Sequence, residues 1–265
     1  MSVRLEGVRK RFGRAEPWVL DGIDATFAAG AVTLVVGGNG SGKSTLLRTV
    51  VGASAPTRGR VLRPAGPAAY VPERLPAELR MTARQYVRHM GRLRGLPAPA
   101  VTARAEELFE RLGLRPGPDV PVGELSKGNS QKVALTQALL APTALLVLDE
   151  PYTGLDPAAA AALTGLVLGA REHGAAVLLS GHETAVSPEA DATYAVRGGV
   201  LAAVDAPAAV RTRLVLRRGR ADAAPPPGGV WDAGRGLLVV VTADPDETLR
   251  TALATGWSFV EGVRS

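Results

Sequence analysis

The sequence predicts an α/β protein with a parallel sheet at its centre, and three stretches carry that prediction. Residues 31–36, AVTLVV, are an apolar run that ends at the glycines of GGNGSGKST and continues into the helical pattern TLLRTVVG. Residues 144–150, ALLVLDE, are apolar on both faces, as a central parallel strand must be. Residues 175–183, AAVLLSGHE, repeat the order of strand and then polar loop.

Further segments surround this centre. The stretches SVRLEGV and IDATFAAG near the N-terminus alternate as strands do and predict an antiparallel β portion. Residues from about 75 to 140 predict a helical insert. Its first helix, in MTARQYVRHMGRLRG, opens with the capping box Thr82-x-x-Gln85, and its second, in PAVTARAEELFERLGL, stops at Gly113.

The first helix of the insert has two predicted faces. Its apolar side chains, Tyr86, Met90 and Leu93, follow helical spacing. A stripe of like charges lies on another face and consists of Arg84, Arg88 and Arg92. Such a stripe is either a solvated face or a docking surface for a partner.

The chain divides in two on this interpretation. We expect one domain over residues 1–210, followed by a small α+β appendage over residues 211–265. The appendage contains the strand patterns RLVLRRG and GLLVVVTA and a helix capped by Asp244. A stabilising or dimer-supporting tail fits this segment better than a ligand-sensing domain.

Composition excludes several classes of protein. The formal net charge of +6 would permit contact with nucleic acid, but aromatic residues make up 4% and the arginines form no dense tract, so no nucleic-acid partner is expected. The chain has no cysteine, which excludes disulfides and thiolate metal sites. The first ten residues, MSVRLEGVRK, lack the apolar core of a signal peptide, and no stretch reaches the ~20 apolar residues of a membrane span.

The glycine-rich stretch matches the phosphate-binding pattern G-x-x-x-x-G-K-S at Gly37, Gly42, Lys43 and Ser44. Its glycines let backbone N–H groups wrap phosphates, the lysine reaches the β and γ phosphates, and the serine hydroxyl is a ligand for Mg²⁺. A chance glycine-rich turn is the alternative, and the strand before and the helix after the motif argue against it.

The strand predicted at 144–150 ends in two carboxylates. Asp149 is placed to hold the shell of a Mg²⁺ ion, and Glu150 is placed to orient and deprotonate an attacking water. An acidic strand end paired with an arginine is the alternative for either residue. The presence of both in a chain with a phosphate-binding loop favours hydrolysis.

A second anion site is predicted at LSKGN, residues 125–129, where small polar residues lead into a helix. Ser126 and Gly128 and the helix start behind them offer N–H donors and the positive end of a dipole. His182, at the end of the strand pattern AAVLLSG, is a further candidate site residue. The alternative is that it is a polar loop residue without a functional role.

Taken together, these stretches resemble the nucleotide-binding subunit of an ATP-binding cassette (ABC) transporter, a P-loop NTPase, over roughly residues 1–210. The order carries the resemblance: GGNGSGKST as Walker A, YVPE as the Q-loop, LSKGN as the signature, LLVLDEP as Walker B, TGLD as the D-loop and His182 as the switch histidine. The Q-loop, the signature and the first insert helix look most like the branch that serves type 2 ABC exporters.

The resemblance implies a role for each matching position. Phe12 looks like the aromatic that stacks on adenine, with Trp18 as the alternative. Glu150 and His182 would be the catalytic residues, with ATP and Mg²⁺ as cofactors. The residues expected to bind ATP are Phe12, Gly37, Asn39, Gly40, Ser41, Gly42, Lys43, Ser44, Thr45, Ser126, Gly128 and Asn129. The expected metal ligands are Ser44, Glu73 and Asp149.

Three positions depart from the family pattern. Glu73 stands at the Q-loop position where glutamine is usual, which keeps an oxygen ligand but adds a negative charge near the phosphates. Lys127 replaces the usual glycine of the signature, and Asn129 replaces the usual glutamine.

The resemblance also implies partners. Two cassettes would face each other head to tail, so that the signature of one chain closes over the ATP of the other, here as a homodimer. The Q-loop and the helical insert would receive a separate polytopic membrane permease that exports an unidentified substrate, which places the chain on the cytoplasmic face of the cell membrane. A soluble ABC ATPase acting on ribosomes or DNA is the alternative, and a self-contained P-loop kinase or metabolic NTPase is a third.

Overall fold

The computed structural model describes residues 2–76, 78–182, 187, 189–204, 212–219, 229–232, 237–242 and 245–264. The chain forms two compact units, 1–204 (the core unit) and 205–265 (the C-terminal unit). The boundary predicted after residue 210 falls among residues outside this description, and the assignment of two functional domains stays a prediction.

A mixed sheet forms the centre of the core unit, with strand order β5-β6-β7-β3-β8-β9. Neighbours from β5 to β8 pair in parallel, and β9 joins β8 in antiparallel pairing. The strands are β3 (Ala31–Val36), β5 (Ala68–Val71), β6 (Leu145–Leu148), β7 (Ala176–Gly181), β8 (Ala192–Arg197) and β9 (Val200–Val204). The predicted α/β class with a parallel centre is therefore confirmed.

A smaller antiparallel sheet, in the order β2-β1-β4, belongs to the same unit. Its strands are β1 (Val3–Lys10), β2 (Leu20–Phe27) and β4 (Arg58–Leu62). Helix α1 (Lys43–Val51) shares one hydrophobic cluster with both sheets. Leu46 and Leu47 of α1 are buried there with Val3, Leu20 and Leu178, so the helix after the glycine-rich loop is fixed from two sides.

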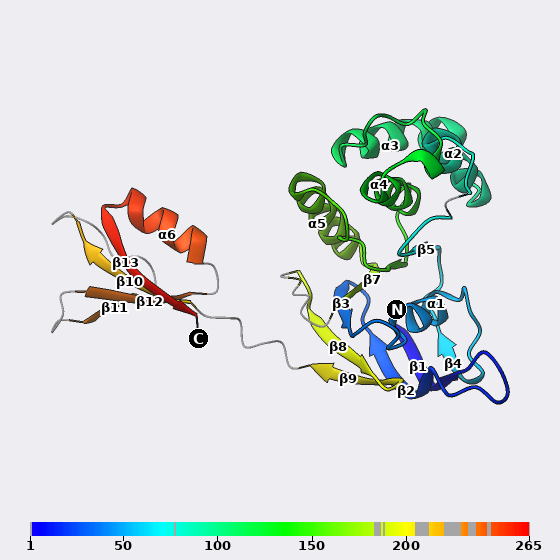
Figure 1. Cartoon of the computed structure of the whole chain (residues 1–265), viewed down its shortest axis with the longest axis horizontal. Coiled ribbons are helices and arrows are strands. Elements are labelled where there is room, and N and C mark those ends of the chain that lie inside the picture. Colours follow the sequence, from blue (N-terminus) through cyan, green and yellow to red (C-terminus); the bar gives the residue numbers. More distant parts are fainter. Residues whose placement is uncertain are drawn as a thin grey trace. The chain divides into compact units, whose positions relative to one another are not determined.

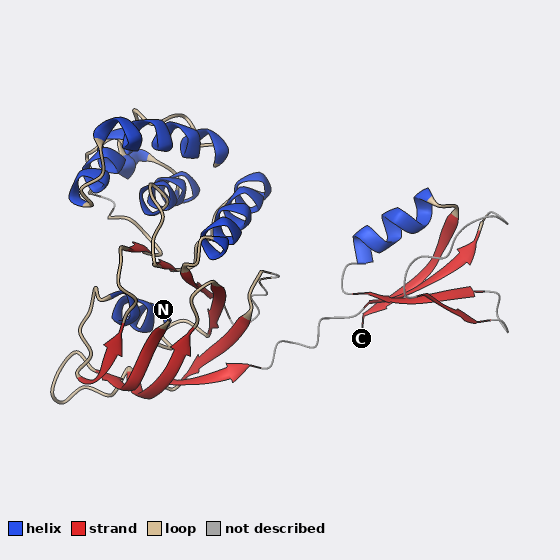
Figure 2. Ribbon diagram, turned by 180° about the vertical axis from the view of Figure 1, so that it is seen from behind, coloured by secondary structure: helices blue, strands red, loops and turns tan. Residues whose placement is uncertain are grey.

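The other face of the mixed sheet packs against helices. Figures 1 and 2 show α2, α3 and α4 grouped at one end of the core unit. The helices are α2 (Ala83–Leu93), α3 (Ala98–Arg111), the short 3₁₀ helix η1 (Val122–Glu124), α4 (Lys127–Ala138) and α5 (Pro157–Glu172). A second hydrophobic cluster lies between the sheet and α3, α4 and α5, and alternate sheet residues such as Leu34, Leu146 and Leu179 are buried in it. Burial on both sides explains why the central strands are apolar on both faces.

The capping box that begins α2 is confirmed. The Thr82 hydroxyl accepts a hydrogen bond from the Gln85 backbone N–H at 3.2 Å, and the Gln85 side-chain oxygen accepts one from the Thr82 N–H at 3.0 Å. The predicted apolar face is wrong at Leu93, which is 69% exposed. The buried residues are instead Ala83, Val87 and Gly91.

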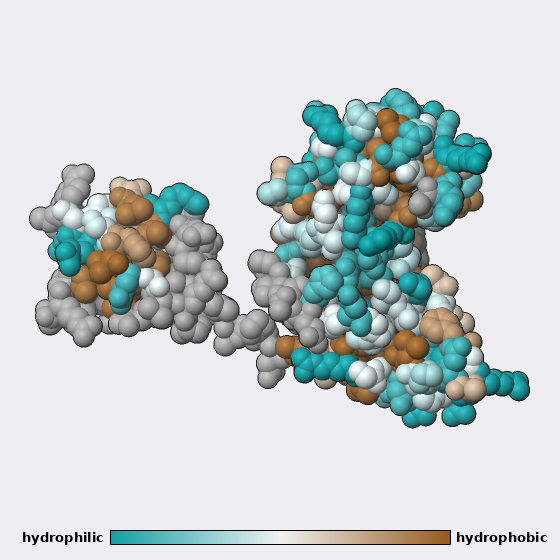
Figure 3. Space-filling view, viewed as in Figure 1, coloured by the Kyte–Doolittle hydropathy of each residue, from teal (hydrophilic) through white to brown (hydrophobic). Residues whose placement is uncertain are grey.

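Close packing of two helices explains that difference. A Cβ atom on Gly91 would lie 2.6 Å from a methyl carbon of Val101 in α3, so the helices cross where α2 carries its smallest residue. Of the predicted large side chains, Tyr86 is partly buried and packs against the cluster that contains Val101, whereas Leu93 stays exposed. Figure 3 shows apolar atoms among hydrophilic ones on the surface of this helical end.

The C-terminal unit is a four-stranded antiparallel sheet, in the order β11-β12-β10-β13, with one helix. Its elements are β10 (Thr212–Arg218), β11 (Gly229–Asp232), β12 (Leu237–Thr242), α6 (Pro245–Ala254) and β13 (Trp257–Arg264). Leu216, Leu238, Ala252 and Trp257 are buried in its core. The predicted helix cap, Asp244, lies outside the described residues.

Candidate active site

The glycine-rich loop, residues 37–42, joins the end of β3 to α1 and is shaped by its glycines. Gly42 is the N-cap of α1 with φ of 106°, a left-handed conformation that favours glycine. A Cβ atom on Gly37 would lie 2.6 Å from the Ser41 hydroxyl oxygen, so no side chain fits there. The loop can therefore turn its backbone N–H groups toward an anion at the helix start.

Lys43 folds back over this loop. Its ammonium donates hydrogen bonds to the carbonyls of Gly37 at 2.8 Å and Gly38 at 3.2 Å, and its side chain is 6% exposed. Ser44 and Thr45 follow at the start of α1 and are half-buried, while Asn39 and Gly40 are exposed at the tip of the loop. A cation held in this way by loop carbonyls is positioned to meet phosphate oxygens.

Asp149, directly after β6, is 1% exposed. One carboxylate oxygen accepts a hydrogen bond of 2.6 Å from the Ser180 hydroxyl, and the other accepts a longer one of 3.4 Å from the Tyr70 hydroxyl. Burial and the negative charge of Asp149 raise the pKa of Tyr70, so this phenol stays a hydrogen-bond donor at neutral pH.

Glu150 adopts a positive φ of 48°, which among described residues other than glycine occurs here alone. Such a conformation costs about 1–3 kcal/mol and persists only where surrounding contacts hold it. The Glu150 N–H donates to the Ser180 hydroxyl at 2.8 Å. Its carboxylate lies 3.8 Å from the Lys43 ammonium and 3.3 Å from Nε2 of His182.

The structure thus brings together four predicted residues from three strand ends. Lys43 follows β3, Asp149 and Glu150 follow β6, and His182 follows β7. Glu150 is 10% exposed and His182 is 58% exposed, so the carboxylate is enclosed while the imidazole faces outward. Strands that run parallel place their carboxyl ends at one edge of the sheet, which is where ligands bind in this class of fold.

Other predicted residues are exposed or only partly buried. Phe12 is 63% exposed, with the Lys10 ammonium 5.3 Å from its ring centre. Trp18, the alternative, has the Arg11 guanidinium 4.6 Å from its ring centre. Glu73 is 43% exposed and pairs with neighbouring Arg74 at 3.6 Å.

The signature loop, residues 125–129, is organised around the start of α4. The Ser126 hydroxyl caps the helix by accepting from the Asn129 N–H at 3.3 Å and also from the Asn129 side-chain amide at 3.0 Å. The side-chain oxygen of Asn129 accepts from the Arg115 N–H at 3.0 Å. A Cβ on Gly128 would lie 2.2 Å from the Gly154 carbonyl, so only glycine fits beside the loop at 153–156.

The donor set of the site fits Mg²⁺ carried by a nucleotide. The candidate ligands are oxygens: the Ser44 hydroxyl, the buried carboxylate of Asp149 and the exposed carboxylate of Glu73. Mg²⁺ prefers oxygen and is commonly held by one or two protein ligands with substrate phosphates. Within the described ranges, no group of three or more His, Cys, Asp or Glu side chains forms a metal site of its own.

Sequence reasoning missed Ser180 and Tyr70. Each contacts Asp149 from a neighbouring strand, Ser180 from β7 and Tyr70 from β5. A polar residue inside the apolar run AAVLLSG was the visible signal for Ser180. No described helix is long and apolar enough to cross a membrane.

Comparisons with known proteins identify the family of this chain. A family model described as "ABC transporter" matches residues 20–153. The chain is 40% identical over 184 residues to the zinc import ATP-binding protein ZnuC of Paramagnetospirillum magneticum, covering 68% of each chain. It is 39% identical over 167 residues to the cytochrome c biogenesis ATP-binding export protein CcmA of Cupriavidus pinatubonensis, covering 59% of this chain and 73% of that protein.

Solved structures are similar as well. One described as an ATP-binding subunit of an ABC transporter superposes with a TM-score of 0.69 at 25% identity, covering 77% of this chain and 91% of that one. A nucleotide-free ATP-binding cassette from an ABC transporter gives a TM-score of 0.62 at 28% identity, covering 78% and 92%. The chain belongs to the ABC transporter family as an ATP-binding subunit, and it is an ATPase.

Proposed function

We propose that the chain hydrolyses ATP at Glu150 to drive transport through a separate membrane permease. The observation that carries the proposal is the convergence of Lys43 and His182 on the Glu150 carboxylate at the sheet edge. The Lys43 ammonium lies 3.8 Å from one carboxylate oxygen, and Nε2 of His182 lies 3.3 Å from the other. An enclosed carboxylate beside a phosphate-binding lysine suits a base that activates water for attack on a γ-phosphate.

The other residues take supporting roles in this proposal. Backbone N–H groups of the glycine-rich loop and the Lys43 ammonium bind the β and γ phosphates. Ser44 and Asp149, with Glu73 at the Q-loop, would hold a Mg²⁺ ion that neutralises charge on the phosphates. His182 contacts the γ-phosphate, and Phe12 stacks on adenine, where its exposed ring is free to meet a base.

A second copy of the chain completes the site in this proposal. Ser126 is exposed, and no hydrogen bond or ion pair among the described residues joins residues 126–129 to the glycine-rich loop. The N–H groups at the start of α4 therefore serve the nucleotide of a facing subunit, to which they offer a positive dipole end. Loss of the γ-phosphate removes those contacts and lets the dimer open.

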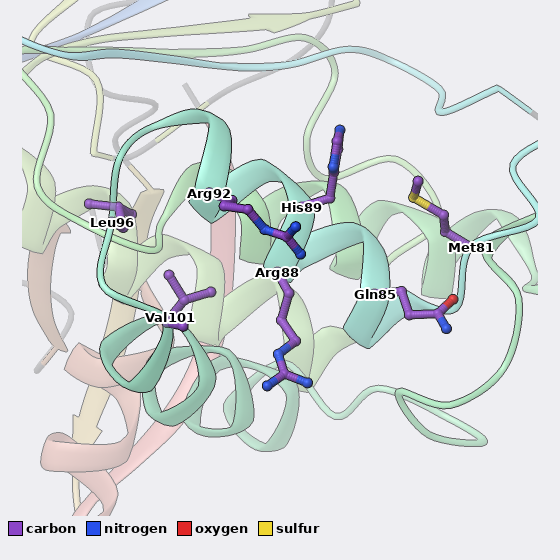
Figure 4. A pocket seen from close by; sticks show the side chains of 8 residues that line it. Met81, Gln85, Arg88, His89, Arg92, Leu96 and Val101 are labelled. Carbon is purple, nitrogen blue, oxygen red and sulfur yellow. The ribbon is translucent and has the colours of Figure 1, made fainter.

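The permease docks on the helical insert in this proposal. A hollow of about 630 Å³ lies on α2 and α3 and is lined by Met81, Gln85, Arg88, His89, Arg92, Leu96, Ala98 and Val101 (Figure 4). Arg84 on the same helix already contacts Asp119 and Glu106, whereas Arg88 and Arg92 have no ion pair among the described residues. A short segment with a carboxylate and an apolar side chain would complement this hollow.

We propose export as the direction of transport. Support comes from the resemblance of the Q-loop, the signature and the first insert helix to the type 2 exporter branch. The names of similar proteins divide between import and export, as ZnuC and CcmA illustrate. Inverted membrane vesicles that take up a compound only with ATP indicate export, and uptake by right-side-out vesicles with ATP inside indicates import.

Affinity purification tests the partner. The Glu150→Gln chain is purified with ATP and Mg²⁺ from detergent-solubilised membranes of its native cell, and we expect a polytopic membrane protein to accompany it. Arg88→Glu combined with Arg92→Glu should release that protein. Arg4→Glu combined with Arg197→Glu, which alters two exposed arginines on strands, is the matched control. Reproducible recovery of ribosomal or DNA-associated proteins instead would favour a soluble ABC ATPase that acts on ribosomes or DNA.

A further inference from the structure

The Ser180 hydroxyl links both acidic residues at the end of β6. It donates to the Asp149 carboxylate at 2.6 Å and accepts from the Glu150 N–H at 2.8 Å. Ser180 is 4% exposed and Asp149 is 1% exposed, so water does not replace these bonds readily. One hydroxyl thus donates to one residue and accepts from the next, at the two positions that directly follow the neighbouring strand β6.

We infer that Ser180 is a positioning residue for ATP hydrolysis, which sets the Asp149 carboxylate and the Glu150 backbone at the same time. The inference rests on the proposed roles of Asp149 as metal ligand and Glu150 as base. Ser180 itself touches neither the nucleotide nor the water in this account. It acts by holding the two carboxylate residues in one arrangement.

The geometry around Glu150 supports this role. A left-handed glutamate needs external contacts to hold its backbone. The Glu150 N–H donates to Ser180 at 2.8 Å, and the Glu150 carbonyl accepts a longer bond of 3.2 Å from the Thr153 N–H. The Glu150 carboxylate lies 3.8 Å from the Lys43 ammonium and 3.3 Å from Nε2 of His182. The hydrogen bond from the Glu150 N–H to Ser180 therefore helps to fix the backbone from which the Glu150 carboxylate extends.

The geometry around Asp149 points the same way. Its second hydroxyl partner, Tyr70, is 3.4 Å away, a weak hydrogen bond at best. The 2.6 Å bond from Ser180 fixes one oxygen and leaves the other turned toward Tyr70. Such outer contacts to a metal-binding carboxylate commonly change metal affinity or activity by about 10–100-fold when removed.

The test compares Ser180→Ala with Ser180→Thr in the full chain. Ser180→Ala should lower kcat about 10–100-fold and leave the affinity for ATP without metal unchanged. It should also weaken Mn²⁺ binding, measured by electron paramagnetic resonance in the presence of a non-hydrolysable ATP analogue. Ser180→Thr keeps the hydroxyl and should restore both readouts toward the parent values.

A second buried hydroxyl provides the control. Thr136 is fully buried and its hydroxyl bonds the Lys132 carbonyl within α4, so Thr136→Val removes a buried hydroxyl away from the two carboxylates. It should change stability without moving kcat or Mn²⁺ affinity. If Ser180→Ala keeps the parent kcat and Mn²⁺ affinity, or if Ser180→Thr fails to restore them in a folded chain that binds ATP, the inference is wrong.

The same series separates this inference from the proposed function. Parent turnover in Glu150→Gln would remove Glu150 as the base, whatever Ser180 does. Loss of turnover in Glu150→Gln with parent behaviour in Ser180→Ala would reject only the positioning role of Ser180.

Discussion

The two predicted phosphate-binding regions of the core unit differ in how their groups are held. At the glycine-rich loop, Lys43 is 6% exposed and is fixed by two carbonyls and the charge of Glu150. At the signature loop, Ser126 is exposed, and Asn129, three residues on, is the one hydrogen-bond partner of its hydroxyl among the residues that the structure describes. The first region is assembled from three strand ends, whereas the second is built from one helix start.

This difference indicates which of the two regions can bind a nucleotide without a second subunit. Lys43 bonds to two loop carbonyls and lies 3.8 Å from Glu150, and Ser180 bonds to both Asp149 and Glu150. In our proposal the phosphate-binding groups and the base are therefore organised before any partner arrives. The exposed donors of the signature loop have no phosphate to meet in their own chain in our proposal. They gain a ligand when a second subunit closes over them.

The largest expected effect comes from Glu150→Gln, which keeps the shape of the side chain but removes the base. We expect turnover to fall by about 10²–10⁴-fold, measured by release of inorganic phosphate. ATP should still bind, and light scattering should detect a dimer that persists with ATP. A variant that turns over at the parent rate would exclude Glu150 as the base.

Lys43→Ala should have the next largest effect, on binding. The ammonium is the main cationic side chain of the glycine-rich loop, and a hydrogen bond to a charged group contributes about 1.5–3 kcal/mol, or roughly 10–100-fold in affinity. Titration with a fluorescent ATP analogue measures the loss. Lys127→Ala changes an exposed lysine of the signature loop and should leave the affinity of a monomeric sample as it was.

Ser126→Ala sharpens the comparison, because it alters only the exposed region. We expect hydrolysis at dimer-forming concentrations to fall about tenfold, while ATP affinity of the monomer stays unchanged. Since Ser126 also caps α4, the variant loses about 1 kcal/mol of stability. Thr82→Ala removes the cap of α2 at similar expected cost and should keep its ATPase rate. A parallel loss of monomer affinity in Ser126→Ala would contradict closure over a partner's nucleotide.

Sequence patterns predicted the parts of the site that depend on neighbours along the chain. A strand before and a helix after the glycines placed Lys43, and an apolar strand before two carboxylates placed Asp149 and Glu150 at the sheet edge. The predicted α/β class followed from the same strands. These features need only local spacing and the rule that parallel strands end together.

Contacts between distant segments were not predictable in the same way. Ser180 meets Asp149 across 31 positions in sequence, and Gly91 meets Val101 at a helix crossing that hydrophobic spacing does not reveal. The apolar face of α2 was predicted from large side chains, although close approach selects small ones. The positive φ of Glu150 likewise follows from its surroundings rather than from its residue type.

The smallest expected effect concerns the contacts that join α4 to the rest of the core unit. Lys132 in α4 is 7% exposed, and its ammonium donates to Asp156 at 2.7 Å and to the Gly113 carbonyl at 3.0 Å. Lys132→Met should lower the free energy of unfolding by about 1–2 kcal/mol at pH 7, because a charged hydrogen-bonded group is lost while an apolar chain of similar length remains. Urea unfolding measures it, and Lys127→Met on the same helix should stay within about 0.5 kcal/mol of the parent.

The stability difference between the parent and Lys132→Met should depend on pH, because Lys132 pairs with the carboxylate of Asp156. The hydrogen bond from Lys132, followed by the cap bond to Ala159, holds the pKa of Asp156 below its usual range. A lowered pKa means that the stabilisation is present above the unfolded pKa of about 3.9 and is lost as the pH falls through the lower folded value. The difference between the parent and Lys132→Met should therefore be constant from pH 7 to about pH 5 and shrink as the pH falls below about 4. A difference that stays constant well below pH 4 would show that Lys132 stabilises the helix through contacts other than Asp156, such as the Gly113 carbonyl.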